Sequence, residues 1–241
     1  SAVQIHAERY FDTNRSKIEE IKAMFADEKS KNVYSKMIDN MVLGRFVDFS
    51  LAEPNQYIDN DIIPFLSDDE VIIDAGVCHG EEIDKAIHMN PNVIVHAFEP
   101  DTHSIVELKK KYSGNSNIKL YNKALWNEKK TLCFSTNSMS PTASRLSEES
   151  GEIHIQAVAL DETVDDKVSL IKMDIEGAEY FALQGAEKII KKNQPKLAIC
   201  IYHNVEDYIE IPLLLKKINP IYKFYFRQHN VINCESVLYA I

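Results

Sequence analysis

The stretch that most constrains the fold is Val71–Gly80, which reads VIIDAGVCHG. An apolar, β-branched run leads into Asp74 and then Gly76, and a helical pattern begins at Gly80. Such a run is typical of a parallel strand that is buried on both faces. Gly76 permits a tight turn and a close ligand approach, and Gly80 permits close packing where the helix begins. The stretch therefore predicts a strand, a turn and a helix whose first N–H groups can hold a ligand.

The spacing of the acid and the glycines favours one class of ligand. A dinucleotide site has the pattern G-x-G-x-x-G, whereas this turn reads D-x-G-x-x-x-G. Asp74 suits a ligand with a cationic end, such as the amino and sulfonium groups of S-adenosylmethionine, better than it suits a pyrophosphate. A second apolar strand, Val93–Phe98, ends in Glu99 and Pro100, where an acid is positioned for ribose hydroxyls. The turn alone is equally compatible with an ordinary strand-turn-helix unit.

Length and charge exclude several classes of protein. The 241 residues suffice for one large α/β domain, or one domain with an extension, and 45% hydrophobic residues can fill its core. A net charge of −10 argues against a nucleic-acid surface or an acidic membrane. No run approaches the roughly 20 apolar residues of a membrane span. The four cysteines lie far apart, so we expect free thiols in a reducing cytoplasm rather than a zinc site.

Residues 1–50 are predicted to be helical. Ile18, Ile21 and Phe25 share one helix face, and another face begins at Tyr34 and continues at helical spacing. We favour a cover that packs on the sheet, with a lid or a dimer surface as alternatives.

From Val71 onward, strands and helices alternate, which predicts a parallel sheet with helical crossovers. The residues 228–236 are too few for a crossover helix, so the last two strands should form an antiparallel hairpin. A long polar loop, Asn137–Gly151, should be functional or disordered. The predicted helices are Gly80–Met89, Thr102–Tyr112, Val205–Ile218 and a single helix that opens at Glu176 and continues past Ile189. The remaining predicted strands are Ile118–Tyr121, Thr131–Ser135, Ile153–Leu160, Leu170–Met173, Lys196–Tyr202, Tyr222–Arg227 and Val237–Ile241.

On five segments the chain resembles the FkbM family of S-adenosylmethionine-dependent methyltransferases. They are VIIDAGVCHG, AFEPD at 97–101, NKALWNE at 122–128, LIKMDIEGAE at 170–179 and LAICIYHNVEDYIEIPLLL at 197–215. Cys78 and His79 depart from the small or polar residues usual in the family's first loop. The resemblance implies an α/β, Rossmann-like class I methyltransferase fold with a mostly parallel seven-stranded sheet and a terminal antiparallel hairpin. The resemblance covers about Val71–Ile241, and we expect an N-terminal helical extension at 1–55 and the methyltransferase domain at 56–241.

The resemblance also implies the cofactor residues. Asp74, Gly76 and Gly80 should hold the amino-acid end of S-adenosylmethionine, and Glu99 should accept both ribose hydroxyls. Glu81 either supports the amino-acid end or is a favourable first-turn acid. Further positions expected to line the cofactor are Pro100, Asn122, Ala124, Leu125 and Asp174. For Asn122, Ala124 and Leu125, strand-end capping and core packing are equally good interpretations, and Ser144 and Arg145 are weaker candidates for closing over the site.

Three polar residues that follow strands are candidates for catalysis: Asp174, His203 and His229. A histidine has an ordinary pKa of about 6.5, which suits it to take a hydroxyl proton at neutral pH. His203 is the preferred base, and a strand-end histidine bonded to backbone is the alternative. Asp174 would orient the base or the acceptor. Together with Glu176 and Glu179 it would suit magnesium, but helix-dipole complementarity explains Glu176, so we expect no metal.

The sequence therefore predicts an S-adenosylmethionine-dependent O-methyltransferase that acts on a hydroxyl of a sugar, glycan precursor or natural product. The alternatives are a non-catalytic S-adenosylmethionine-binding protein and a nicotinamide-dependent oxidoreductase. We expect a small-molecule or glycan acceptor, no nucleic-acid partner and no membrane span, and a homodimer remains open.

Overall fold

The computed structural model describes residues 1–135, 145–147, 153–232 and 234–241. The chain divides into two compact units. We call Phe65–Lys196 the central unit, and Ser1–Pro64 together with Leu197–Ile241 the terminal unit. The domain boundary expected after residue 55 stays a prediction.

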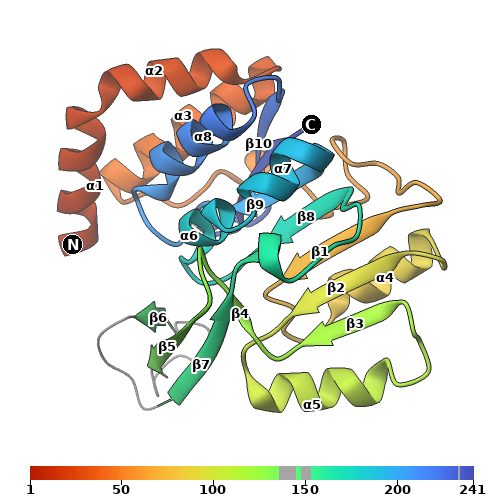
Figure 1. Ribbon diagram of the computed structural model, residues 1–241. Helices are drawn as coiled ribbons and strands as arrows, with labels where there is room; N and C mark the ends of the chain where they lie inside the picture. Colours follow the sequence, from red (N-terminus) through yellow and green to blue (C-terminus); the bar gives the residue numbers. More distant parts are fainter. Residues whose placement is uncertain (136–144, 148–152, 233) are drawn as a thin grey trace. The chain divides into compact units, whose positions relative to one another are not determined.

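Seven strands form a mostly parallel sheet in the order β10-β11-β9-β8-β1-β2-β3. Figure 1 shows its neighbouring strands β8, β1, β2 and β3. With helices between the strands and a helical N-terminal region, this confirms the predicted α/β fold and its terminal antiparallel hairpin. Among the described residues, no helix is long and apolar enough to cross a membrane.

The parallel part of the central unit brings polar residues to one edge. Its elements are β1 (Val71–Ala75), α4 (Glu81–Met89), β2 (Ile94–Phe98), α5 (Thr102–Lys111), β3 (Ile118–Tyr121) and β8 (Leu170–Met173). β1 pairs in parallel with β2 and with β8, so Asp74 lies in register with Ala97 on one side and Lys172 on the other. Parallel strands end at the same edge of a sheet, which is where ligands bind in such folds.

A second, smaller sheet in the central unit has the order β4-β7-β5-β6. Its strands are β4 (Ala124–Leu125), β5 (Lys130–Ser135), β6 (Arg145–Ser147) and β7 (Ile153–Val158). The sequence predicted β5 and β7 but neither β4 nor β6, because strands of two or three residues carry too little periodicity to be recognised. Arg145, predicted in a loop, begins β6, whereas Ser144 and most of the expected loop lie outside the described residues.

The single helix predicted after β8 is wrong, because the structure has two short helices. They are α6 (Glu179–Gln184) and α7 (Glu187–Asn193), and the short helix η3 (Leu160–Glu162) precedes β8. Between α6 and α7, Gly185 packs on the backbone of Trp126, where an added Cβ would lie 2.1 Å from the carbonyl oxygen. Phe181 of α6 is 39% exposed and stacks on the Trp126 ring with centroids 4.3 Å apart.

The terminal unit combines N-terminal helices with the last strands of the chain. Its elements are α1 (Ala2–Thr13), α2 (Arg15–Met24), α3 (Glu28–Leu43), η1 (Phe49–Leu51), β9 (Lys196–Cys200), α8 (Asp207–Ile218), β10 (Phe224–Gln228) and β11 (Ser236–Ala240). The helical prediction for residues 1–50 is therefore confirmed. Tyr34 of α3 is fully buried, donates a hydrogen bond to the Tyr208 carbonyl oxygen at 2.8 Å and packs edge-on against Phe226.

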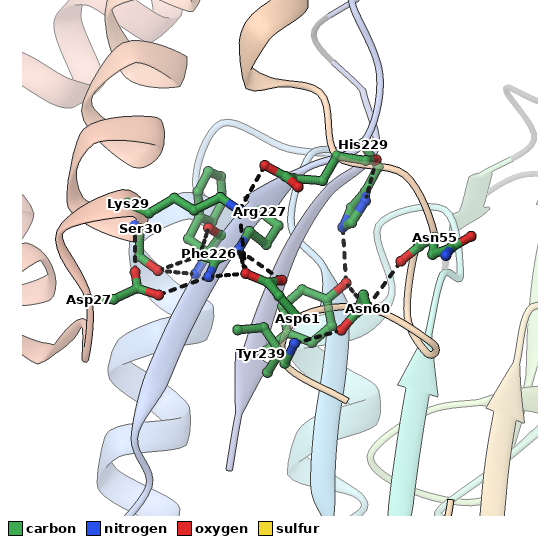
Figure 2. A network of polar contacts seen from close by, with 12 residues as sticks. Asp27, Lys29, Ser30, Asn55, Asn60, Asp61, Phe226, Arg227, His229 and Tyr239 are labelled. Carbon is green, nitrogen blue, oxygen red and sulfur yellow. Dashed lines mark hydrogen bonds and ion pairs between the residues drawn. The ribbon is translucent and has the colours of Figure 1, made fainter. Parts of the chain in front are cut away.

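A buried arginine ties three segments of the terminal unit together (Figure 2). Arg227 on β10 is 2% exposed. Its guanidinium donates to Asp27, the N-cap of α3, at 2.8 Å, to Asp61 at 2.8 Å and to the Ser30 hydroxyl at 2.9 Å. Partial burial acts to raise the pKa of Asp27, but hydrogen bonds from Arg227 and Ser30 outweigh it and lower the pKa to about 2.

Candidate active site

The first site residue predicted, Asp74, is buried beside a lysine that the sequence analysis did not single out. Asp74 is 3% exposed at the end of β1, and its Oδ1 lies 3.0 Å from the ammonium Nζ of Lys172 on β8. The same ammonium donates to the carbonyl oxygens of Ala75 at 3.2 Å and Gly76 at 2.7 Å. Lys172 thus compensates the buried carboxylate and fixes the backbone where β1 turns.

Gly76 occupies a position that no other residue can take. Its φ of +77° is left-handed, and an added Cβ would lie 1.7 Å from the backbone oxygen of Asp174. Its N–H donates to the Phe98 carbonyl oxygen at 3.0 Å. The turn is therefore held between the ends of β2 and β8. Gly80 ends it as the left-handed N-cap of α4, which exposes the first N–H groups of that helix.

Glu99 is anchored by backbone donors on both carboxylate oxygens. It is 7% exposed at the end of β2. Oε2 accepts from the Cys78 N–H at 2.9 Å, and Oε1 accepts from the Asp101 N–H at 2.8 Å. Burial raises the pKa of Glu99, while these two hydrogen bonds act in the opposite direction. Each oxygen keeps a further lone pair, so the fixed carboxylate can accept two hydroxyl groups at once.

The other expected cofactor residues have structural partners of their own. Asn122 donates from Nδ2 to the carbonyl oxygens of Glu99 at 3.0 Å and Pro100 at 2.9 Å, so it braces the turn after β2. Ala124 and Leu125 are buried in β4. Direct contacts of these residues with a cofactor stay a prediction.

The first turn of α4 contains an acid that the sequence analysis passed over. Glu81 is exposed, whereas the side chain of Glu82 turns inward on the same helix face as the buried Ala86. Glu82 Oε2 is buried and has no hydrogen-bond partner in the part of the chain that the structure describes. Burial raises the pKa of Glu82 to about 7. The helical spacing of residues 82 and 86 was the signal that could have identified it.

Asp174 and its neighbours follow β8 in the central unit. The Asp174 N–H donates to the Ala75 carbonyl oxygen at 3.1 Å. Glu176 is exposed in a left-handed conformation, while Glu179 is buried and accepts the Ile175 N–H at 2.8 Å. The expectation of no metal at these acids stays a prediction.

The two candidate histidines belong to the terminal unit. His203 follows β9, and its ring lies 4.1 Å from that of Tyr202, centroid to centroid. His229 follows β10, with Nδ1 3.0 Å from the Glu53 carbonyl oxygen and Nε2 2.9 Å from the Tyr239 hydroxyl (Figure 2). Because a carbonyl only accepts, Nδ1 carries the proton and Nε2 accepts from Tyr239. Burial lowers the pKa of His229, which favours this neutral form.

The sequence profile of the Methyltransferase FkbM domain matches residues 74–224, more than half of the chain. This chain belongs to the FkbM methyltransferase family. All the FkbM segments quoted above except the start of the first strand lie in the matched range.

Solved structures resemble this FkbM chain to different extents. Methyltransferase FkbM from Methylobacillus flagellatus KT superposes with a TM-score of 0.82 at 22% identity, over 97% of this chain and 60% of that chain. An rRNA methylase from Streptococcus thermophilus gives a TM-score of 0.45 at 18% identity, over 73% of this chain and 88% of that chain. Aeropyrum pernix fibrillarin in complex with S-adenosyl-L-methionine gives 0.45 at 8% identity, over 74% of this chain and 69% of that chain.

The likeness to the Methylobacillus FkbM methyltransferase concerns the fold, and this chain spans 60% of that protein's length. No curated protein sequence matches the chain.

Proposed function

We propose that the chain is an S-adenosylmethionine-dependent methyltransferase that transfers a methyl group to a hydroxyl oxygen of a sugar, glycan precursor or natural product. The observation that carries the proposal is the pair of buried carboxylates, Asp74 and Glu99, at the ends of the neighbouring parallel strands β1 and β2. Membership of the FkbM methyltransferase family supports the methyl transfer.

The residues at this edge of the central unit fit the cofactor. Glu99 would hold the ribose hydroxyls, because its two oxygens are fixed and keep free lone pairs. Asp74 would face the cationic amino-acid end. The left-handed Gly76 leaves the backbone open to close approach.

When bound, the cofactor supplies a methyl group that its sulfonium already activates. The chain must then hold the acceptor hydroxyl in line and remove its proton. Orientation of reacting groups contributes about 7–11 kcal/mol and a positioned base about 10²–10⁴-fold. His203 is the proposed base, and its imidazole would take the hydroxyl proton on a ring nitrogen. Asp174 is proposed to orient the acceptor hydroxyl.

His229 is a less favourable base than His203. Both of its ring nitrogens already have partners, and a proton taken on Nε2 would compete with the hydrogen bond from Tyr239. It would act only if that network opened.

A screen of acceptors tests the proposal. Nucleotide-linked sugars and cell-surface glycans would be incubated with methyl-labelled S-adenosylmethionine, and products identified by mass spectrometry. We expect a labelled methyl ether. Calorimetry with S-adenosylmethionine and with a nicotinamide dinucleotide separates this function from the oxidoreductase alternative. S-adenosylmethionine binding without transfer to any acceptor would favour the non-catalytic alternative.

A further inference from the structure

Glu82 is a half-buried acid with one fully buried carboxylate oxygen, and the catalytic scheme has no task for it. It lies in the first turn of α4, directly after the glycine turn, and its Oε2 has no hydrogen-bond partner among the described residues. A buried carboxylate is normally paired or hydrogen-bonded, because the loss of hydration is costly. Burial accordingly raises the pKa of Glu82 to about 7, so much of the empty protein carries a neutral Glu82 at neutral pH.

The charges that face Glu82 leave room for one more cation. Asp74 faces it from β1, Lys172 from β8, and Glu81 and Lys85 from α4 itself. With Glu82 ionised, three carboxylates and two ammonium groups influence one another here, which leaves one negative charge unbalanced. Lys172 does not neutralise this charge on Glu82, because its ammonium contacts Asp74 and two backbone carbonyl oxygens.

We propose that Glu82 receives the cationic amino group of the cofactor's amino-acid end and gives up its own proton as that group binds. The inference rests on the proposed function, and it adds a cofactor-binding residue and the release of a proton when the cofactor binds. The ammonium keeps its three protons and donates one N–H bond to the carboxylate. The proton released from Glu82 passes to the solvent buffer.

The sign of the pH dependence follows from this exchange. An α-amino group has an ordinary pKa of about 8 and is already protonated near pH 6. Binding near pH 6 therefore releases a proton from Glu82, and the amino group of the ligand takes up no proton to compensate. Affinity for ligands that carry the amino group should rise with pH up to about 7 and fall again above about 8, where the free amino group loses its proton. Without ligand, the stability that neutral Glu82 contributes is fully present below its unfolded pKa. That contribution is lost as pH rises through about 7.

Calorimetry with two product-like probes tests the proposal. S-adenosylhomocysteine carries the amino-acid end, whereas 5′-methylthioadenosine has the same adenine and ribose without it. Each is titrated near pH 6 in two buffers of different ionisation enthalpy, which gives the number of protons released. We expect S-adenosylhomocysteine to release roughly half a proton or more beyond 5′-methylthioadenosine. Any proton linked to Glu99 and the ribose cancels in this difference.

Glu82→Gln should abolish the difference while the protein stays folded, since a neutral amide replaces a mostly neutral acid. The matched control Glu107→Gln alters an exposed acid of α5 and should show the same difference in proton release as the parent protein. Equal release by both probes, or a parent-like difference in Glu82→Gln, would overturn the inference. If Glu82→Gln does not fold, the parent decides, because its difference must shrink as pH rises through about 7 and turn into net proton uptake near pH 8, where about half of the free amino group is neutral. Failure of both probes to bind the parent would reject the cofactor site and this inference with it.

Discussion

Glu99 at the end of β2 accepts two backbone N–H groups with its carboxylate, and its remaining lone pairs are proposed to accept the ribose hydroxyls of the cofactor. Glu99→Ala removes the proposed acceptor of the ribose hydroxyls. Hydrogen bonds to charged groups contribute about 1.5–3 kcal/mol, so the S-adenosylmethionine dissociation constant should rise roughly tenfold or more. Calorimetry measures the change.

A ligand pair controls for disruption of the loop in that variant. The parent should bind 5′-methylthioadenosine more tightly than its 2′-deoxy analogue, and Glu99→Ala should bind both alike. A folded Glu99→Ala protein that keeps parent affinity and parent discrimination would remove Glu99 from the ribose site.

His203 is the proposed base for the proton transfer. With an acceptor from the screen, His203→Ala should lower the single-turnover rate by about 10²–10⁴-fold at saturating cofactor. Cofactor affinity should stay near that of the parent. His88→Ala, which alters an exposed histidine of α4, is the matched control. A near-normal rate in His203→Ala would exclude it and make Asp174 or His229 the leading candidate.

Sequence reasoning located Asp74 and Glu99 because each acid ends an apolar run, and the structure buries both. It did not single out Lys172 or Glu82. Lysines and glutamates are usually exposed, so their burial depends on what packs over them. Lys172 lies beside Asp74 because β8 pairs with β1 in this register. The sequence pattern of either segment alone does not reveal the pairing.

At the scale of elements, β1, β2, β3 and β8 were predicted to within one residue, because buried parallel strands are short apolar runs. The division into α6 and α7 was not. Their residues have helical spacing throughout, and α6 ends at Gly185, which lies against the Trp126 carbonyl. Trp126 is distant in sequence, so this contact cannot be predicted from the helical periodicity of residues 178–193.

The turn between β1 and α4 should tolerate no side chain at Gly76. Gly76→Ala places a Cβ 1.7 Å from the Asp174 backbone oxygen in a left-handed conformation. The conformation alone costs about 1–2 kcal/mol, so the loss of unfolding free energy should exceed that. Gly114→Ala is the control, because no atom lies within 4 Å of its added Cβ. Denaturant titration compares them, and equal stability of the two variants would contradict the geometry.

At the scale of the whole molecule, no sequence pattern indicated that residues 1–64 and 197–241 form one unit. The contacts that join them, such as Arg227 with Asp27 and Asp61, are long-range and polar. Arg227→Met should lower the unfolding free energy by about 3 kcal/mol, the lower end for breaking a buried ion pair, because both acids remain partly exposed.

Denaturant titration of Arg227→Met has a matched control in Arg15→Met. Arg15 forms an exposed pair with Asp12, so its loss should change the unfolding free energy very little. Because the pKa of folded Asp27 is lowered to about 2, its contribution to stability is present above the unfolded pKa. The parent should lose this contribution as pH falls from about 4 to 2, and Arg227→Met should lose much less. Equal acid sensitivity would argue against the ion pair.

The most direct measurement of the proposed function follows a labelled methyl group from S-adenosylmethionine into an acceptor and locates it by mass spectrometry. The account predicts one added methyl group on a hydroxyl oxygen of a sugar, glycan precursor or natural product. It also predicts that Glu99→Ala forms this product much more slowly at limiting cofactor. A label found on nitrogen, carbon or sulfur would contradict the proposed reaction, and failure of the parent protein to bind S-adenosylmethionine would contradict the cofactor site itself.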